Sequence, residues 1–160
     1  MRTFMLLKDL PVYDEKAGKI LGRVSDICIT SDGKVSALLI KGKGLFERDR
    51  VVPIESISSF GKDGVMVSDY RLVEKVNHEA DRPTYFLHSH HGLFRKPILS
   101  SEGEKLGLLE DVYFTEEVGT IIGYEVTDGF FADITEGKKV VKTEQPLKIG
   151  EDVIVVYVNS

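Results

Sequence analysis

The chain has 160 residues, of which 42% are hydrophobic and 29% are charged, a composition typical of a folded globular protein. Its formal net charge of −5 at pH 7 argues against a general nucleic-acid-binding protein, because such proteins are normally basic. The apolar run at residues 4–7 is too short for a signal-peptide core or a membrane span, and the single cysteine, Cys28, excludes an intrachain disulfide. We therefore expect a cytoplasmic protein without a membrane span.

The first half of the chain is rich in short β-strand patterns separated by turn residues. Gly22 lies inside the longest pattern and predicts a bulge or sharp bend there, and Asp32-Gly33 predicts a hairpin turn. Residues 53–57 predict one helical turn, since proline is tolerated at the first helical position. The predicted strands are residues 4–7, 12–13, 20–30, 35–41, 50–53, 58–60 and 65–67.

The second half repeats this organisation after a stretch with few core hydrophobes, residues 69–87, in which residues 71–79 have some helical character. Residues 130–135 are a candidate short helical turn. About five short strands per half predict a small antiparallel barrel. The predicted strands are residues 94–99, 105–115, 121–127, 139–143 and 153–158.

The two halves share one pattern of residues. A glycine, a Leu-Gly pair, an aspartate and a turn glycine recur in the same order at a spacing of 85 or 86 residues, and a proline precedes each copy. We interpret this as an internal duplication. The matched structural positions are Gly18, Gly22, Asp26 and Gly33 in the first copy and Gly103, Gly107, Asp111 and Gly119 in the second.

The duplication predicts two domains, residues 1–76 and 93–160, joined by a linker at residues 77–92. Because a domain of about 70 residues has a marginal core, we expect the halves to pack on each other or the chain to form a homodimer. Residues 1–80 carry 13 Lys/Arg and 12 Asp/Glu, whereas residues 81–160 carry 8 and 14. The halves are therefore expected to share a fold but to differ in their surfaces.

The repeated motif resembles the PRC-barrel family. In the first copy it begins at Pro11, continues through the glycines and Asp26 named above, and ends in Val51-Val52-Pro53-Ile54, whereas the second copy ends in Val140-Val141-Lys142-Thr143 without the proline. The family includes the H subunit of a photosynthetic reaction centre, a ribosome-maturation factor of the RimM type and small stand-alone bacterial proteins. The resemblance implies an all-β fold of two tandem β-barrels with short helical turns, used for binding, without shared catalytic residues and without a cofactor.

The repeated aspartates, Asp26 and Asp111, are the first candidate site. A pair of carboxylates could perform acid–base chemistry, but a duplication that repeats an acid is better explained by a structural role. We expect each carboxylate to accept hydrogen bonds from backbone N–H groups near a bend in its own barrel.

Three histidines, His88, His90 and His91, lie within four residues and are a candidate metal site because imidazole is a good ligand for zinc, nickel or copper. No CxxC or HExxH motif accompanies them, so we favour a histidine-bearing linker and predict no metal. A pH-dependent contact between the barrels is a third interpretation.

A basic loop at residues 41–50 and an aromatic segment at the corresponding place in the second copy are candidate partner-binding surfaces. The loop combines cations with an aromatic ring that could stack on a base, although Glu47 and Asp49 offset part of its charge. The candidate partner-binding residues are Lys41, Lys43, Phe46, Arg48, Arg50, Phe130 and Phe131.

The function predicted from these features is a non-catalytic intracellular adaptor or scaffold, not an enzyme, that binds another macromolecule, with a protein as the expected partner. The first alternative is an RNA- or ribosome-associated factor that acts through the basic loop. The second is a metal-binding protein that uses the histidine cluster.

Overall fold

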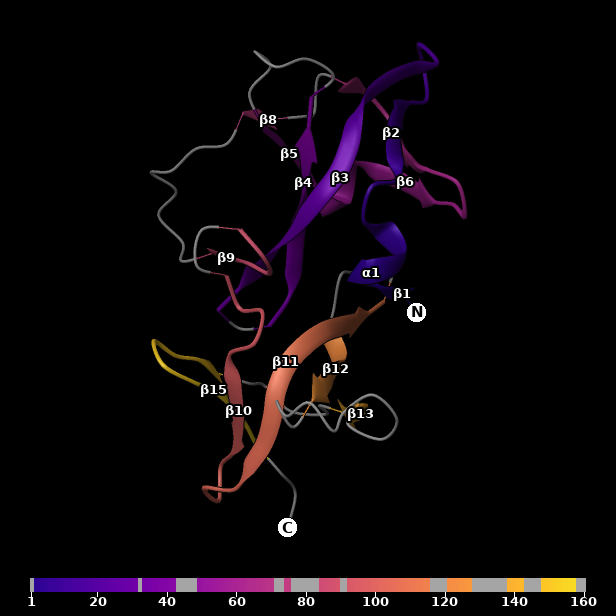
Figure 1. Cartoon of the computed structure of the whole chain (residues 1–160). Helices are drawn as coiled ribbons and strands as arrows, with labels where there is room; N and C mark the ends of the chain where they lie inside the picture. The colour runs from indigo at the N-terminus through magenta and orange to yellow at the C-terminus, as the bar shows by residue number, and fades with distance from the viewer. Residues whose placement is uncertain are drawn as a thin grey trace.

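A computed structural model of the chain describes residues 2–31, 33–42, 49–70, 74–75, 84–89, 92–115, 121–127, 138–142 and 148–157. These residues form two β-sheets, one from each half of the chain (Figure 1). The sheet of the first half lies above that of the second in this view, and the N-terminus lies at the junction between them. The predicted all-β fold with two units is confirmed.

The first sheet contains eight described strands in the order β6-β7-β2-β3-β4-β5-β8, with β9 also paired to β3. A 3-10 turn, η1 (Ile54–Ser56), precedes β6 and confirms the predicted helical turn. The strands are β2 (Pro11–Asp14), β3 (Lys19–Thr30), β4 (Val35–Lys41), β5 (Arg50–Pro53), β6 (Ile57–Phe60), β7 (Val65–Val67), β8 (Glu74–Lys75) and β9 (Thr84–Phe86).

The second sheet contains seven described strands in the order β13-β12-β11-β10-β15-β14, with β1 also paired to β11. The order repeats that of the first sheet around the long central strand, because β10, β11, β12 and β15 correspond to β2, β3, β4 and β7. The strands are β1 (Arg2–Thr3), β10 (Pro97–Ser100), β11 (Lys105–Phe114), β12 (Ile121–Thr127), β13 (Lys138–Lys142), β14 (Lys148–Ile149) and β15 (Ile154–Val156).

The pairing is antiparallel except at one place in each sheet. β7 runs parallel to β2, and β15 runs parallel to β10. The predicted antiparallel pairing therefore holds in every described ladder except one in each sheet. The parallel ladder arises because the second strand of a late hairpin pairs with the free edge of the first hairpin. Over the described part of the chain, the ladders run as open paths from β6 to β8 and from β13 to β14.

Both long central strands bend at a glycine. Gly22 in β3 has a φ of +155° and Gly107 in β11 has a φ of +147°. A Cβ atom on Gly22 would lie 2.3 Å from the carbonyl oxygen of Lys41, and one on Gly107 would lie 2.7 Å from that of Thr127. Each bend therefore requires glycine for two reasons: the φ angle disfavours other residues, and the neighbouring strand leaves no room for a Cβ atom.

The short segment α1 (Phe4–Leu7) is a single helical turn, so the prediction of a strand at residues 4–7 was wrong. A strand would bury alternate residues, but here Phe4 and Leu7 are fully buried whereas Met5 and Leu6 are 59% and 64% exposed. This spacing of three fits a helical turn, because residues three apart share one face. Among the described residues, no helix is long and apolar enough to cross a membrane.

The buried side chains form one hydrophobic cluster that includes residues of both halves. At the junction the ring of Phe60 in β6 lies 6.2 Å from that of Phe114 in β11, in an edge-to-face arrangement. Phe4 and Leu7 of α1 belong to the same cluster. The two halves therefore pack on each other, as their small size predicts.

The stretch with few core hydrophobes, residues 69–87, contains two strands, β8 and β9, and both pair with the first sheet. Of these, β9 lies within the predicted linker at residues 77–92. The helical character predicted for residues 71–79 is absent at Glu74–Lys75, which is β8, and the remainder of that range lies outside the described residues. The turn predicted at residues 130–135 also lies outside them.

Candidate functional site

Asp26 lies in a gap along one edge of β3. On this edge β2 pairs with β3 up to Arg23, and β9 pairs with it from Cys28 onward. Asp26 is fully buried between the two neighbours. Its Oδ1 accepts hydrogen bonds from the backbone N–H groups of Ile27 (2.8 Å), Leu87 (3.2 Å) and His88 (3.2 Å), and its Oδ2 accepts from those of His88 (3.1 Å) and Ser89 (2.7 Å).

Asp111 occupies the equivalent gap on β11, between β10 and β1. It is 3% exposed. Its Oδ1 accepts hydrogen bonds from the backbone N–H groups of Phe4 (3.0 Å) and Val112 (2.7 Å), and its Oδ2 accepts from that of Met5 (3.2 Å). Burial raises the pKa of Asp111, and the three backbone hydrogen bonds offset part of that increase.

The donors to each aspartate come largely from the other half of the chain. We call the segment that precedes β2, residues 2–7, the first leader, and the segment that precedes β10, residues 84–89, the second leader. The first leader is bound by Asp111 and β11 of the second sheet, whereas the second leader is bound by Asp26 and β3 of the first sheet. The expectation that each aspartate serves only its own barrel was therefore incomplete.

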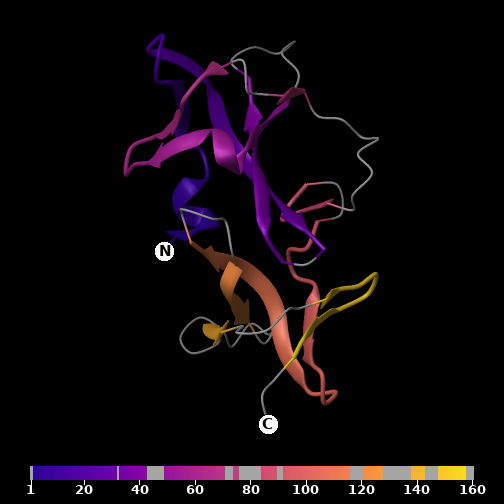
Figure 2. The ribbon, with the colours of Figure 1, turned by 180° about the vertical axis from the view of Figure 1, so that it is seen from behind.

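The exchange of leaders is reciprocal in detail. The N–H of Asp9 donates to the carbonyl of Val24 at 2.8 Å, and the N–H of Arg95 donates to that of Leu109 at 2.7 Å. Asp9 and Arg95 are also the two described non-glycine residues with positive φ, at 67° and 71°. Each leader thus packs on the opposite unit and is followed by a residue with positive φ that hydrogen-bonds to the central strand of its own unit. This exchange connects the two sheets (Figure 2).

His88 is the member of the histidine cluster that the structure describes. His88 is exposed, and its imidazole contacts two phenylalanine rings in tilted arrangements, with its ring centroid 5.4 Å from that of Phe4 and 4.7 Å from that of Phe94. His90 and His91 lie outside the described residues. Within the described part of the chain, no group of three or more His, Cys, Asp or Glu side chains is arranged to hold a metal ion.

Cys28 lies on β3 two residues beyond Asp26 and is buried. Burial, with a smaller contribution from the Asp26 carboxylate, raises the pKa of the Cys28 thiol to about 12. The thiolate is therefore essentially unpopulated near neutral pH, which makes this side chain a poor nucleophile.

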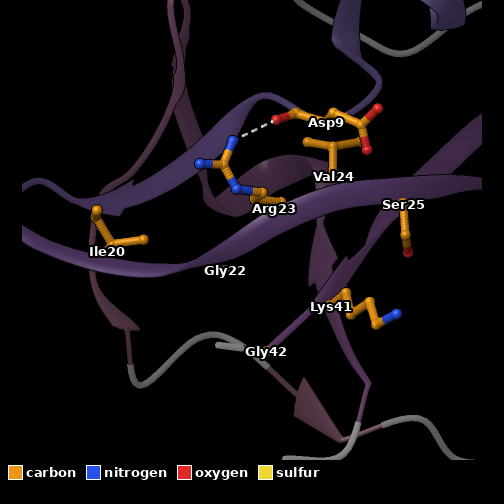
Figure 3. Close-up of a pocket in the computed structure, with 8 residues that line it drawn as sticks. All are labelled: Asp9, Ile20, Gly22, Arg23, Val24, Ser25, Lys41 and Gly42. Atoms are coloured by element: carbon orange, nitrogen blue, oxygen red, sulfur yellow. Dashed lines mark hydrogen bonds between the residues drawn. The ribbon is translucent and has the colours of Figure 1, made fainter. Parts of the chain in front are cut away.

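A cationic groove lies beside the bend at Gly22, where β3 and the end of β4 meet Asp9 (Figure 3). It has a volume of about 580 Å³. Arg23 and Lys41 are directly opposite each other in the β3–β4 register, and both side chains are exposed. Arg23 Nη1 donates to the carbonyl oxygen of Asp9 at 2.9 Å. The groove is lined by Asp9, Ile20, Gly22, Arg23, Val24, Ser25, Lys41 and Gly42.

The predicted partner-binding residues are only partly described. Lys41 lies in the cationic groove. Arg50 is half-buried and its guanidinium donates to the carbonyl of Leu21, so it is used within the fold. Lys43, Phe46, Arg48, Phe130 and Phe131 lie outside the described residues, as does the motif glycine Gly119.

Sequence reasoning missed Arg23 as a partner of Lys41. A hairpin counted outward from a two-residue Asp32-Gly33 turn pairs Arg23 with Gly42 and Val24 with Lys41, so the simple count is off by one residue. In the structure the register shifts between Val24 and Asp26 and again between Cys28 and Ile29. The position of Arg23 opposite Lys41 therefore depends on the bulges of the hairpin.

Two comparisons with known proteins bear on this structure. The family model described as PRC-barrel domain matches the chain twice, at residues 5–73 and 88–159. A protein of Bacillus subtilis (strain 168), described as "Uncharacterized protein YrrD", is 31% identical over 158 residues, which covers 97% of this chain and 87% of the relative.

Proposed function

We propose that this chain, which belongs to the PRC-barrel domain family, is a non-catalytic cytoplasmic adaptor that binds a partner protein. Its two units share a fold and a motif, but a function is expected to reside in the places where they differ. The proposal rests on the role of Asp26 and Asp111 within the fold and on the cationic groove as an exposed surface.

The observation that carries the proposal is the use of Asp26 and Asp111. A general acid or base needs a carboxyl group within reach of a substrate proton. Both of these carboxylates are buried, and both oxygens of each accept backbone N–H groups. The most prominent acids of the motif therefore hold the two units in one arrangement, which suits a protein that presents two different faces to a partner.

An RNA partner is the second candidate function, and the cationic groove is the observation that favours it. Arg23 and Lys41 could contact phosphates, since phosphate contacts are made mainly by Arg and Lys. The net charge of −5 opposes this function, because long-range repulsion lowers the affinity of an acidic protein for RNA.

The test is crosslinking inside the cells that produce the chain, followed by isolation under denaturing conditions and mass spectrometry. We expect one protein to be crosslinked in amounts comparable to the chain, and to be absent from a parallel capture with an unrelated acidic protein of similar pI, about 5.4. Loss of the partner after ribonuclease treatment would favour the RNA function instead. Recovery of the chain alone would contradict an adaptor role.

A further inference from the structure

The two cations of the groove are placed unfavourably for stability. Arg23 and Lys41 are directly opposite Cα partners on adjacent antiparallel strands. Like charges at such positions repel each other, and this arrangement destabilises a sheet. Among the described residues no acceptor lies within hydrogen-bonding distance of the Lys41 ammonium group. Figure 3 shows the Arg23 guanidinium pointing toward Asp9 and the Lys41 ammonium group pointing the other way, so that each cation can meet a separate anionic group.

The rest of the groove limits what an anionic ligand can be. Ile20 lines the groove and is 39% exposed, which provides an apolar contact beside the cations. Figure 3 shows the Arg23 guanidinium reaching the Asp9 carbonyl, while the Asp9 carboxylate points away from it. The guanidinium is therefore held in place by one hydrogen bond and retains further N–H donors for a ligand.

The second unit shows that the fold does not require these cations. The register pair equivalent to Arg23 and Lys41 is Leu108 and Thr127. Beside that pair, the Arg95 guanidinium and the Glu110 carboxylate form an ion pair at 3.1 Å. The same bend is thus neutralised internally in the second unit and left with unbalanced positive charge in the first, which indicates a site specific to the first unit.

We propose that the cationic groove binds an acidic segment of the partner protein, with one carboxylate against Arg23, another against Lys41 and an apolar side chain against Ile20. This inference rests on the adaptor function proposed above. A peptide is favoured over RNA because none of the described residues that line the groove is aromatic, whereas binding of single strands relies on stacked aromatic rings. Arg pairs with carboxylates through two parallel N–H···O bonds, which gives such a segment a defined orientation.

The experiment is fluorescence anisotropy with a labelled ten-residue peptide of alternating Glu and Leu. The same peptide with Gln in place of Glu, and a single-stranded RNA of matched charge, are the comparison probes. The test variant is Arg23→Leu/Lys41→Thr, which carries the residues that the second unit itself uses. The control variant is Lys34→Thr/Lys62→Thr, which removes two exposed cations distant in sequence from the groove and has the same net charge.

We expect the wild type and the control variant to bind the Glu peptide alike, the test variant to bind about tenfold more weakly, and the Gln peptide to show no binding. The test variant should unfold at nearly the same urea concentration as the wild type, because it loses one exposed hydrogen bond, from Arg23 to the Asp9 carbonyl, and also removes two like charges from opposite positions. The inference would be overturned if the two variants bound the Glu peptide equally weakly, or if the wild type did not bind this peptide. It would also be overturned if the wild type bound the RNA more tightly than the Glu peptide and the test variant did not bind the RNA. If a crosslinked partner is found but is retained by the test variant, the adaptor function stands and the groove assignment fails.

Discussion

The exchange of leaders predicts that Asp111→Ala destabilises the chain far from the substituted position. The substitution leaves the buried N–H groups of Phe4 and Val112 without an acceptor, at a cost of about 1–3 kcal/mol for each, and also removes the acceptor of the partly buried N–H of Met5. If the first leader detaches instead, the fold loses the burial of Phe4 and Leu7, worth about 1.5–3 kcal/mol each. Removal of a buried charge offsets part of either cost. We expect a net loss of about 3 kcal/mol in the free energy of unfolding, a large part of a typical domain's stability.

The assay is urea unfolding followed by circular dichroism, combined with hydrogen exchange read by mass spectrometry. Asp111→Ala should accelerate amide exchange in residues 2–7, which are separated from Asp111 by more than 100 positions. Asp26→Ala should do the same in residues 84–89. Glu104→Ala is the control, because it removes an exposed acid from the same unit and should change stability by less than about 0.5 kcal/mol. Unchanged exchange in residues 2–7 of Asp111→Ala would refute the reciprocal arrangement.

Three further predictions concern single residues. Gly22→Ala should destabilise the chain by several kcal/mol, on the order of 3, in urea unfolding, because its Cβ would lie 2.3 Å from the Lys41 carbonyl oxygen and its φ of +155° disfavours alanine. The pKa of Asp111 is raised above its ordinary value of 3.8, so the stability that this group contributes is present below pH 3.8 and is lost as the pH rises through the raised pKa. As the pH rises from 3.8 through the raised pKa of Asp111, the free energy of unfolding of the wild type should accordingly fall relative to that of Asp111→Asn. Cys28, with a pKa of about 12, should react with a thiol reagent at pH 8 only slowly in the folded protein and rapidly in urea.

Each of these predictions has an outcome that contradicts it. A Gly22→Ala variant as stable as the wild type would mean that β4 can move away from the bend at little cost. A wild type that gains stability relative to Asp111→Asn as the pH rises would mean that the three N–H donors outweigh burial and lower the pKa. Equal reaction rates of Cys28 in the folded and unfolded chain would mean that β9 does not cover it.

Much of the local structure could be predicted because it depends on neighbouring residues. β4 and β12 have the predicted bounds, and the predicted bend at Gly22 is present. Both follow from residue patterns within a few positions, namely β-branched runs, turn residues and glycine. The strand predicted at residues 4–7 failed because four apolar residues carry no readable period, so that only packing against both sheets decides between helix and strand.

The candidate site was harder to predict, because its contacts are distant in sequence and largely involve backbone groups. Asp26 and Asp111 were recognised as acceptors of backbone hydrogen bonds, since a repeated acid in a repeated fold has few other uses. Apart from the adjacent Ile27 and Val112, their donors are backbone N–H groups more than 60 and more than 100 residues away, and every residue except proline carries such a group. No side-chain pattern could therefore identify the leaders as their partners.

The sequence by itself determined the duplication, the strand pattern of each unit and the glycines at the two bends, because each depends on the conformational preferences of a few adjacent residues. The tertiary structure decided that the leaders exchange between units and that Arg23 lies opposite Lys41 in the β3–β4 register, whereas the second unit carries an internal ion pair at the same bend. These features arise from long-range pairing of strands, whose free energy comes from burial and from satisfied backbone groups summed over the whole fold.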